Sequence, residues 1–96
     1  MRIEWDPEKN RGNVSKHGVS FNEAAQLLAS TTNYLEIYDE IHSEVEARFI
    51  AIGPIDRGVI VVVYTEEDDG VLRIISARMA TKHELRRYED HEKASR

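Results

Sequence analysis

The sequence predicts an α+β domain spanning residues 1–96, with two N-terminal helices and one C-terminal helix packed on one face of a mainly antiparallel sheet of four to five strands. Helix-capping signals and a helical apolar period occupy the first 30 residues. From residue 34 the apolar period changes to two, which is typical of strands. Short turns separate these runs, and closely joined strands pair in antiparallel order.

The first third of the chain predicts one short strand and two helices. Residues 2–5, "RIEW", form the strand. Asp6 and Pro7 supply an N-cap and a proline at the first helical position, and Gly18 ends that helix in the left-handed conformation. Residues 20–23, "SFNE", form a capping box for the second helix. The apolar face of this helix consists of Phe21, Ala24, Ala25 and Leu28.

The rest of the chain predicts a meander of four strands followed by a helix. Residues 59–64, "VIVVVY", have no polar alternation, so they indicate a central strand that is covered on both faces. Residues 81–84, "TKHE", form a second capping box, and Leu85 and Tyr88 are the apolar anchors of the helix that it opens. The four strands are expected at 34–38, 47–52, 59–65 and 71–77.

Composition places the chain among soluble proteins of a reducing compartment. It is 41% hydrophobic and 32% charged, and it contains no cysteine. Its longest apolar run is too short to span a bilayer. The N-terminus carries charges where a signal peptide needs an apolar stretch. We therefore expect a cytoplasmic protein with no membrane partner.

Charge is distributed unevenly along the chain, whose formal net charge is −5. Residues 39–70 contain two Lys or Arg against nine Asp or Glu, whereas residues 71–96 contain seven against four. The basic C-terminal third is where we expect an anionic partner. The negative total argues mildly against nucleic acid, because phosphate neutralisation supplies much of the affinity for it.

Two arginines lie in or at the end of the last predicted strand. Arg73 is inside an apolar run, where an arginine is costly unless it is paired or faces a groove. One interpretation is an ion pair with a neighbouring carboxylate such as Glu46. The other is anion binding, since the planar guanidinium fork suits phosphate oxygens. Strict alternation places Arg73 on one face of the strand and Ser76 and Arg78 on the other.

Other polar residues allow both structural and chemical interpretations. His17 is favoured at a helix end by the macrodipole, but imidazole also serves as a general base or acid. The segment "HSEVEAR" (42–48) places His42, Glu44, Glu46 and Arg48 at alternate positions. A carboxylate beside an arginine there forms a surface salt bridge, or it is a base beside its electrostatic partner. The histidine spacing does not fit a zinc site, and no nucleotide-binding glycine loop is present. From these residues alone we expect a small domain with an anion-binding groove.

Several segments together resemble the BrnT family of bacterial type II toxins. They occur in the family's order and cover most of the chain; they are "WDPEKNRGNVSKHGVSFNEAA" (5–25), "HSEVEARFIAIG" (42–53), "GVIVVVYTEEDDGVLRIISARMAT" (58–81) and "ELRRYE" (84–89). The resemblance implies a RelE-like fold and a ribonuclease that arrests translation without a metal or other cofactor. It also implies a cognate antitoxin of the ribbon-helix-helix type in a heterotetramer. Operator DNA is then bound only through the antitoxin.

The resemblance also implies roles for individual residues. Arginines hold the scissile phosphate, a base takes the proton of the attacking 2′-hydroxyl, and further side chains contact the RNA. For Tyr64 the alternative to stacking on a base is packing at the edge of the core. The arginines are Arg48, Arg73 and Arg78, the base is His17 or Glu46, and the further contacts are Lys16, Tyr64 and Ser76.

Two departures from the family pattern concern the proposed groove. Met79 stands where relatives usually have Lys or Arg, which removes one positive charge beside the groove. Val45 and Ala47 replace a glycine and a charged residue of "HSEGEER". Neither change affects the arginines, so we expect a weaker or more selective nuclease.

Two other functions compete with an RNA-cleaving toxin. The first is an antitoxin-binding co-repressor with little catalysis. The second is a phosphoester hydrolase or small-nucleotide binder that uses the same arginines. The feature that discriminates these functions is whether Arg73 and Arg78 converge with His17 or Glu46 in one concavity.

Overall fold

The computed structural model describes residues 2–30, 34–42 and 46–94. Its elements follow the predicted order, which confirms the α+β class. The helices are α1 (Pro7–His17), α2 (Phe21–Ala29) and α3 (Lys82–Ala94), with a 3-10 helix, η1 (Glu40–His42). The strands are β1 (Arg2–Glu4), β2 (Leu35–Tyr38), β3 (Ala47–Ile55), β4 (Gly58–Glu66) and β5 (Val71–Met79).

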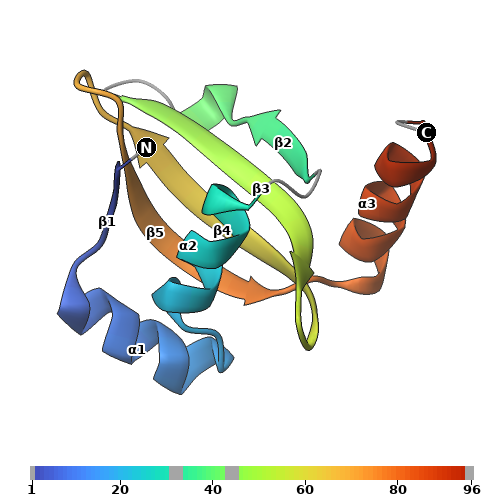
Figure 1. Cartoon of the computed structure of the whole chain (residues 1–96), viewed down its shortest axis with the longest axis horizontal. Coiled ribbons are helices and arrows are strands. Elements are labelled where there is room, and N and C mark those ends of the chain that lie inside the picture. Colours follow the sequence, from blue (N-terminus) through green and yellow to red (C-terminus); the bar gives the residue numbers. More distant parts are fainter. Residues whose placement is uncertain (1, 31–33, 43–45, 95–96) are drawn as a thin grey trace.

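The described strands form a five-stranded sheet in the order β1-β5-β4-β3-β2 (Figure 1). Strands β2 to β5 form the predicted antiparallel meander, and β4 lies in the middle of the sheet, as predicted. The first strand, β1, pairs with β5 in parallel, so that Glu4 lies opposite Arg73. This parallel pair brings the beginning of the chain against the strand that carries the two arginines.

The predicted helix termini are confirmed. Asp6 caps α1 by accepting a hydrogen bond from the backbone N–H of Glu8, and Gly18 ends α1 in the left-handed conformation at φ 73°. Ser20 and Glu23 form both hydrogen bonds of the capping box that opens α2. These local contacts satisfy backbone groups that a helix end leaves unpaired. No helix in the described ranges is long and apolar enough to cross a membrane.

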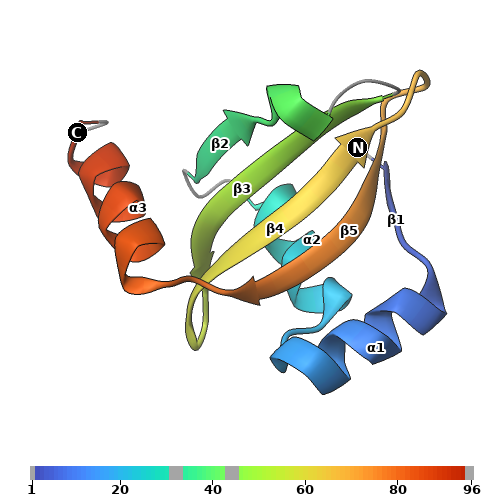
Figure 2. The same ribbon diagram turned by 180° about the vertical axis from the view of Figure 1, so that it is seen from behind.

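The helices lie on both faces of the sheet, so the prediction that all three pack on one face is wrong. Helix α2 crosses in front of the strands in Figure 1 and behind them in Figure 2. Ala51 and Val62 pack in the core beneath α2, whereas their strand neighbours Ile52 and Val61 pack with Tyr88 of α3. Successive strand residues point to opposite faces, which places α3 on the far side. Leu85, the other predicted anchor, is exposed.

A buried asparagine joins α1 to the edge of β5. Asn13 donates from Nδ2 to the backbone oxygens of Val19 and Ala77, and its Oδ1 accepts from the backbone N–H of Ala77. β1 pairs with β5 only at residues 71–73, so the Asn13 amide replaces a neighbouring strand at residue 77. This side chain fixes where α1 lies along β5.

Candidate functional site

Two arginines face each other across the sheet with a threonine between them. Arg48 of β3 lies opposite Thr65 of β4, and Thr65 lies opposite Arg73 of β5. Paired residues of neighbouring strands point to the same face. Thr65 has the same parity along β4 as Val61, which packs with Tyr88 of α3. The three residues therefore lie on the α3 side of the sheet.

A β-bulge in β5 places the two arginines of that strand on the same face. Arg73 and Arg78 are five positions apart, and strict alternation would separate them. Adjacent residues of β4 pair with Ser76 and with Ile74, so Ile75 is skipped. This extra residue reverses the alternation, and the prediction of opposite faces is wrong. We call the α3 side of the sheet, with Arg48, Arg73, Ser76 and Arg78, the arginine face.

Arg73 is held by two carboxylates and remains accessible. Its Nε donates to Glu67 at 3.0 Å, and its Nη2 lies 3.7 Å from an oxygen of Glu4. The side chain is 42% exposed, so these ion pairs are partly screened by water. The partners are not Glu46, which the sequence suggested. The guanidinium group is therefore open to a phosphate that displaces one of these carboxylates.

Arg78 forms a two-bond ion pair with the first turn of α3. Both of its bonds to Glu84 are 2.7 Å long. Glu84 also accepts from the backbone N–H of Thr81, which confirms the predicted capping box. The bonds from Arg78, together with those from Thr81, lower the pKa of Glu84 to about 2. Glu84 thus occupies the guanidinium fork that a phosphate would use.

Arg78 lies at some distance from the pair formed by Arg48 and Arg73. It pairs with Val61, four residues of β4 away from Thr65. At the usual rise of a strand this separation is roughly 13 Å. The arginine face is therefore long enough to contact more than one phosphate of a chain.

Thr65 was not among the predicted site residues. It is 3% exposed, and its hydroxyl has no hydrogen-bond partner among the described residues. A buried hydroxyl without a partner is unusual and costs free energy. Threonine is common in strands, so the sequence contained no sign of this position.

Lys16 and His17 lie in the last turn of α1, away from the arginine face. This helix borders β5 where Asn13 bonds to Ala77, a residue of the core beneath α2. Lys16 is exposed and His17 is partly buried. Within residues 2–30, 34–42 and 46–94, the charged partners of Arg73 are Glu4 and Glu67, and that of Arg78 is Glu84. The structure does not join His17 to the arginines.

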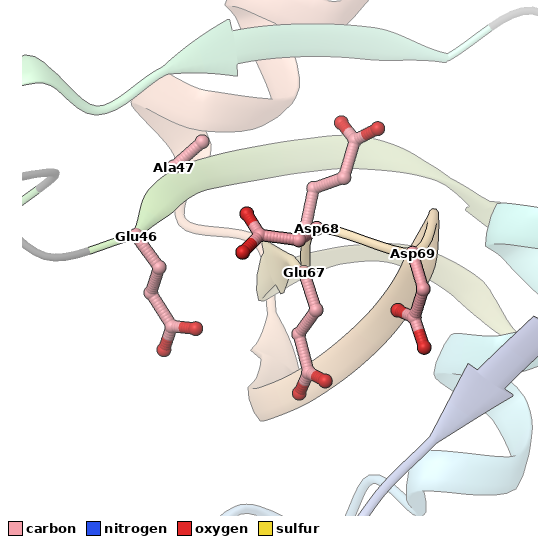
Figure 3. Close-up of a pocket in the computed structure, with 6 residues that line it drawn as sticks. Glu46, Ala47, Glu67, Asp68 and Asp69 are labelled. Atoms are coloured by element: carbon pink, nitrogen blue, oxygen red, sulfur yellow. The ribbon is translucent and has the colours of Figure 1, made fainter.

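Glu46 lines an acidic hollow of about 660 Å³ beside the arginine face. Figure 3 shows the carboxylates of Glu46 and Glu67 pointing to the same side of the hollow. Glu67 also binds Arg73, so Glu46 shares this hollow with a partner of Arg73. Glu44 and Val45 of the same motif lie outside the described residues. The hollow is lined by Glu46, Ala47, Glu66, Glu67, Asp68 and Asp69.

These carboxylates do not form a metal site by geometry. In the part of the chain that the structure describes, no group of three or more His, Asp or Glu side chains is placed to hold a metal ion. The hollow is a region of concentrated negative charge, which attracts positively charged groups.

Tyr64 lies on the opposite face from the arginines. It is 2% exposed, it stacks on Phe49 at a centroid distance of 5.6 Å, and its hydroxyl donates to Glu36 at 2.5 Å. Burial and the bond to Glu36 raise its pKa. This placement fits the packing role that the sequence allowed as an alternative to base stacking.

Met79 also points away from the arginine face. It pairs with Ile60, a residue of the core beneath α2, and its side chain is 39% exposed. A lysine or arginine at this position would lie on the other side of the strand from Arg78. The expectation that Met79 removes a charge beside the groove is therefore wrong.

Comparison with known proteins agrees with this architecture. Residues 5–84 match the family described as "Ribonuclease toxin, BrnT, of type II toxin-antitoxin system". The chain belongs to the BrnT family. The matched span includes the whole arginine face and Glu84, so the site described above lies within the part that the family shares.

A solved structure of the family has the same fold. The Brucella abortus ribonuclease toxin BrnT is 26% identical and superposes with a TM-score of 0.65. The match covers 85% of this chain and 99% of the other. No curated protein sequence matches the chain. The structural match confirms the helices and the mainly antiparallel sheet that the resemblance implied.

Proposed function

We propose that this chain is a metal-independent endoribonuclease that arrests translation in the cytoplasm and that a cognate antitoxin neutralises. The observation that carries the proposal is the arginine face, on which a bulge aligns Arg73 with Arg78 and strand pairing aligns Arg73 with Arg48. Phosphoryl transfer depends mainly on positioning and on stabilising the charge of the transition state. The guanidinium groups of Arg48 on β3 and of Arg73 and Arg78 on β5 supply both.

The proposed reaction uses the RNA's own nucleophile. The 2′-oxygen loses its proton to a base and bonds to the adjacent phosphorus, and the bond from phosphorus to the 5′-oxygen breaks. The leaving oxygen takes a proton from water, which yields a 2′,3′-cyclic phosphate and a 5′-hydroxyl. Arg48 and Arg73 hold the phosphorane oxygens, while Arg78 and Ser76 hold a neighbouring phosphate.

Glu46 is better placed than His17 to take the proton. It precedes the strand that carries Arg48, and it lines the hollow that contains Glu67, the partner of Arg73. A carboxylate beside guanidinium groups can act as a general base in such a reaction. Lys16 and His17 would contact RNA only where it passes around the edge of β5.

Cleavage of mixed-sequence RNA by the purified chain tests the proposal. We expect new 2′,3′-cyclic phosphate ends that are unaffected by a chelator. Arg73→Ala should lower the rate by roughly 100-fold or more, whereas Arg86→Ala, on the exposed side of α3, should not. Equal cleavage by the wild type and Arg73→Ala would remove the arginine face from the mechanism.

The co-repressor interpretation remains the second candidate because both arginines of β5 bind carboxylates in the free protein. Expression of the chain without its antitoxin distinguishes the ribonuclease from the co-repressor. Growth arrest that the antitoxin relieves supports the ribonuclease, and unchanged growth with intact RNA supports the co-repressor.

We further propose that the antitoxin is a ribbon-helix-helix protein that forms a heterotetramer of two toxins and two antitoxins. Operator DNA is then bound by the antitoxin part. The acidic hollow supports this arrangement, because its charge attracts a basic segment of a partner protein. The mass of the purified complex in solution tests the stoichiometry.

A further inference from the structure

A hollow of about 310 Å³ lies beside Arg73, at the end of β1. It is lined by Ile3, Glu4, Trp5 and Arg73. The parallel pairing of β1 with β5 creates it, since this pairing sets Glu4 opposite Arg73. Trp5 follows directly and packs partly against the core beneath α2. The hollow therefore adjoins the arginine face.

The lining residues provide the chemistry by which proteins recognise an unpaired nucleobase. An indole ring is a stacking surface for a base, and a neighbouring guanidinium group holds the phosphate of the same nucleotide. Glu4 supplies carboxylate oxygens, which accept hydrogen bonds from the N–H groups of a base edge. The volume of the hollow is sufficient for one base.

The carboxylate favours one base in particular. Glu4 is held by Arg2 at 2.6 Å and by Arg73 at 3.7 Å, through different oxygens. Each oxygen retains acceptor capacity, because an ionised carboxylate accepts about four hydrogen bonds. Guanine presents two adjacent N–H donors on its Watson–Crick edge, which match the two oxygens. Uracil and adenine present a donor beside an acceptor, and this pattern matches the two carboxylate oxygens of Glu4 less well.

We propose that this hollow binds one guanine base of the RNA, with Trp5 as the stacking surface and Glu4 as the acceptor, next to the phosphate held by Arg73. The inference rests on the proposed ribonuclease function and names a specificity subsite of it. Tyr64, the aromatic residue that the sequence suggested for stacking, is 2% exposed within the core beneath α2. Trp5 is only partly buried against that core, and it lines the hollow.

The chain contains one tryptophan, so its fluorescence reports on this hollow directly. The probes are two tetranucleotides with methylated 2′-hydroxyls, which cannot be cleaved; one contains a single guanine and the other has uracil in its place. We expect saturable quenching of Trp5 by both probes and binding of the guanine probe that is roughly tenfold tighter. Glu4→Gln should abolish the difference between them.

Cleavage of natural RNA gives an independent readout. Trp5→Leu should raise KM roughly tenfold and spread cleavage over more sequences with little change in kcat, while Trp5→Phe, which keeps an aromatic ring, should restore the pattern. The melting temperature of each variant shows whether it is folded. The fluorescence experiment uses the wild-type chain and does not depend on the folding of Trp5→Leu.

The possible failures can be distinguished. The subsite would be overturned if the probes do not quench Trp5 saturably and Trp5→Leu cuts RNA at the same sequences as the wild type. Because the wild-type chain would still cleave RNA, that result would leave the ribonuclease function intact. Equal binding of the guanine and uracil probes would overturn the assignment of guanine. Quenching without any RNA cleavage would instead overturn the proposed function while the base-binding hollow stands.

Discussion

The ion pair between Arg78 and Glu84 connects the site to the stability of the fold. Its two short hydrogen bonds tie the end of β5 to the first turn of α3. The same pair lowers the pKa of Glu84 to about 2 and raises the pKa of Arg78. Deprotonated Glu84 therefore stabilises the folded chain, and a phosphate that binds Arg78 must compete with it.

Stability should depend on pH through Glu84. Because its folded pKa of about 2 is below the ordinary value of 4.5, its contribution is complete above pH 4.5 and is lost as the pH falls toward 2. We expect Glu84→Gln to lower the free energy of unfolding by about 1 kcal/mol at pH 6 and by progressively less below pH 4.5. Urea denaturation at several pH values measures this difference.

Glu89→Gln, on an exposed part of α3, is the control for loss of a carboxylate. Glu23, whose pKa is lowered to about 2 mainly by its hydrogen bond from Arg57, is present in all three proteins and cancels. A difference between wild type and Glu84→Gln that does not change with pH would contradict the prediction.

Thr65→Val should not destabilise the chain. The hydroxyl is buried without a partner among the described residues, so valine removes a desolvated polar atom while keeping the shape. The free energy of unfolding should stay the same or rise by up to about 1 kcal/mol. Chemical denaturation of both proteins checks this, and a clear loss of stability would show that the hydroxyl has a partner.

At the scale of elements, β5 is the strand that organises the molecule. It pairs with β1 and β4, its edge is capped by a side chain of α1, and its bulge turns Arg73 to the arginine face. Two of these contacts come from segments more than 60 residues away in the sequence. The placement of the site therefore depends on how the N-terminal segment docks.

Asn13→Ala should destabilise the fold by about 1–3 kcal/mol. The substitution leaves the backbone N–H and oxygen of Ala77 without their side-chain partner in a buried place. Asn22→Ala, on the exposed side of α2, is the matched control. Equal effects of the two substitutions on urea denaturation would show that the Asn13 amide does not cap the edge.

At the scale of the whole molecule, charge is separated into two adjoining regions. The arginine face carries guanidinium groups, and the hollow beside it carries carboxylates from the start of β3, the end of β4 and the following turn. Glu67 belongs to both regions, because it lines the hollow and binds Arg73. Regions of opposite charge steer partners of opposite charge to different places. In the proposed function, RNA and a basic antitoxin segment have neighbouring sites on one chain.

Neutralising the acidic hollow should weaken the antitoxin complex. We expect Asp68→Asn combined with Asp69→Asn to raise the Kd for the antitoxin roughly tenfold at low salt, with the effect shrinking at high salt. Binding titrations at two salt concentrations measure it. Asp90→Asn combined with Glu89→Gln, on α3, removes the same charge elsewhere, and an equal loss there would contradict a role for the hollow.

Much of the fold could be predicted because its signals are local. The caps at Asp6, Gly18 and Ser20 act through residues two to four positions away, so the chain near each cap contains the whole interaction. The central position of β4 followed from its unbroken apolar run. The arginines and carboxylates of the candidate site could also be recognised in the sequence. Their positions relative to one another could not be predicted from it.

Three features of the site depended on contacts between distant segments. The face of the sheet to which Arg73 points depends on which residue of β4 it pairs with. The bulge that sets this pairing leaves no mark in the composition of an apolar strand, so the sequence did not indicate it. The face of the sheet on which α3 packs depends on the contact of Tyr88 with Ile52 and Val61. The hollow at Trp5 exists because β1 lies parallel to β5.

The sequence by itself determined the elements, their order, the family and the arginines that we propose to bind phosphate. Only the tertiary structure decided that Arg48, Arg73 and Arg78 share one face while His17 and Tyr64 do not. The physical reason is that side-chain direction in a strand alternates with every residue. One skipped residue, set by pairing with a partner strand, reverses that direction, and this decides which charges meet.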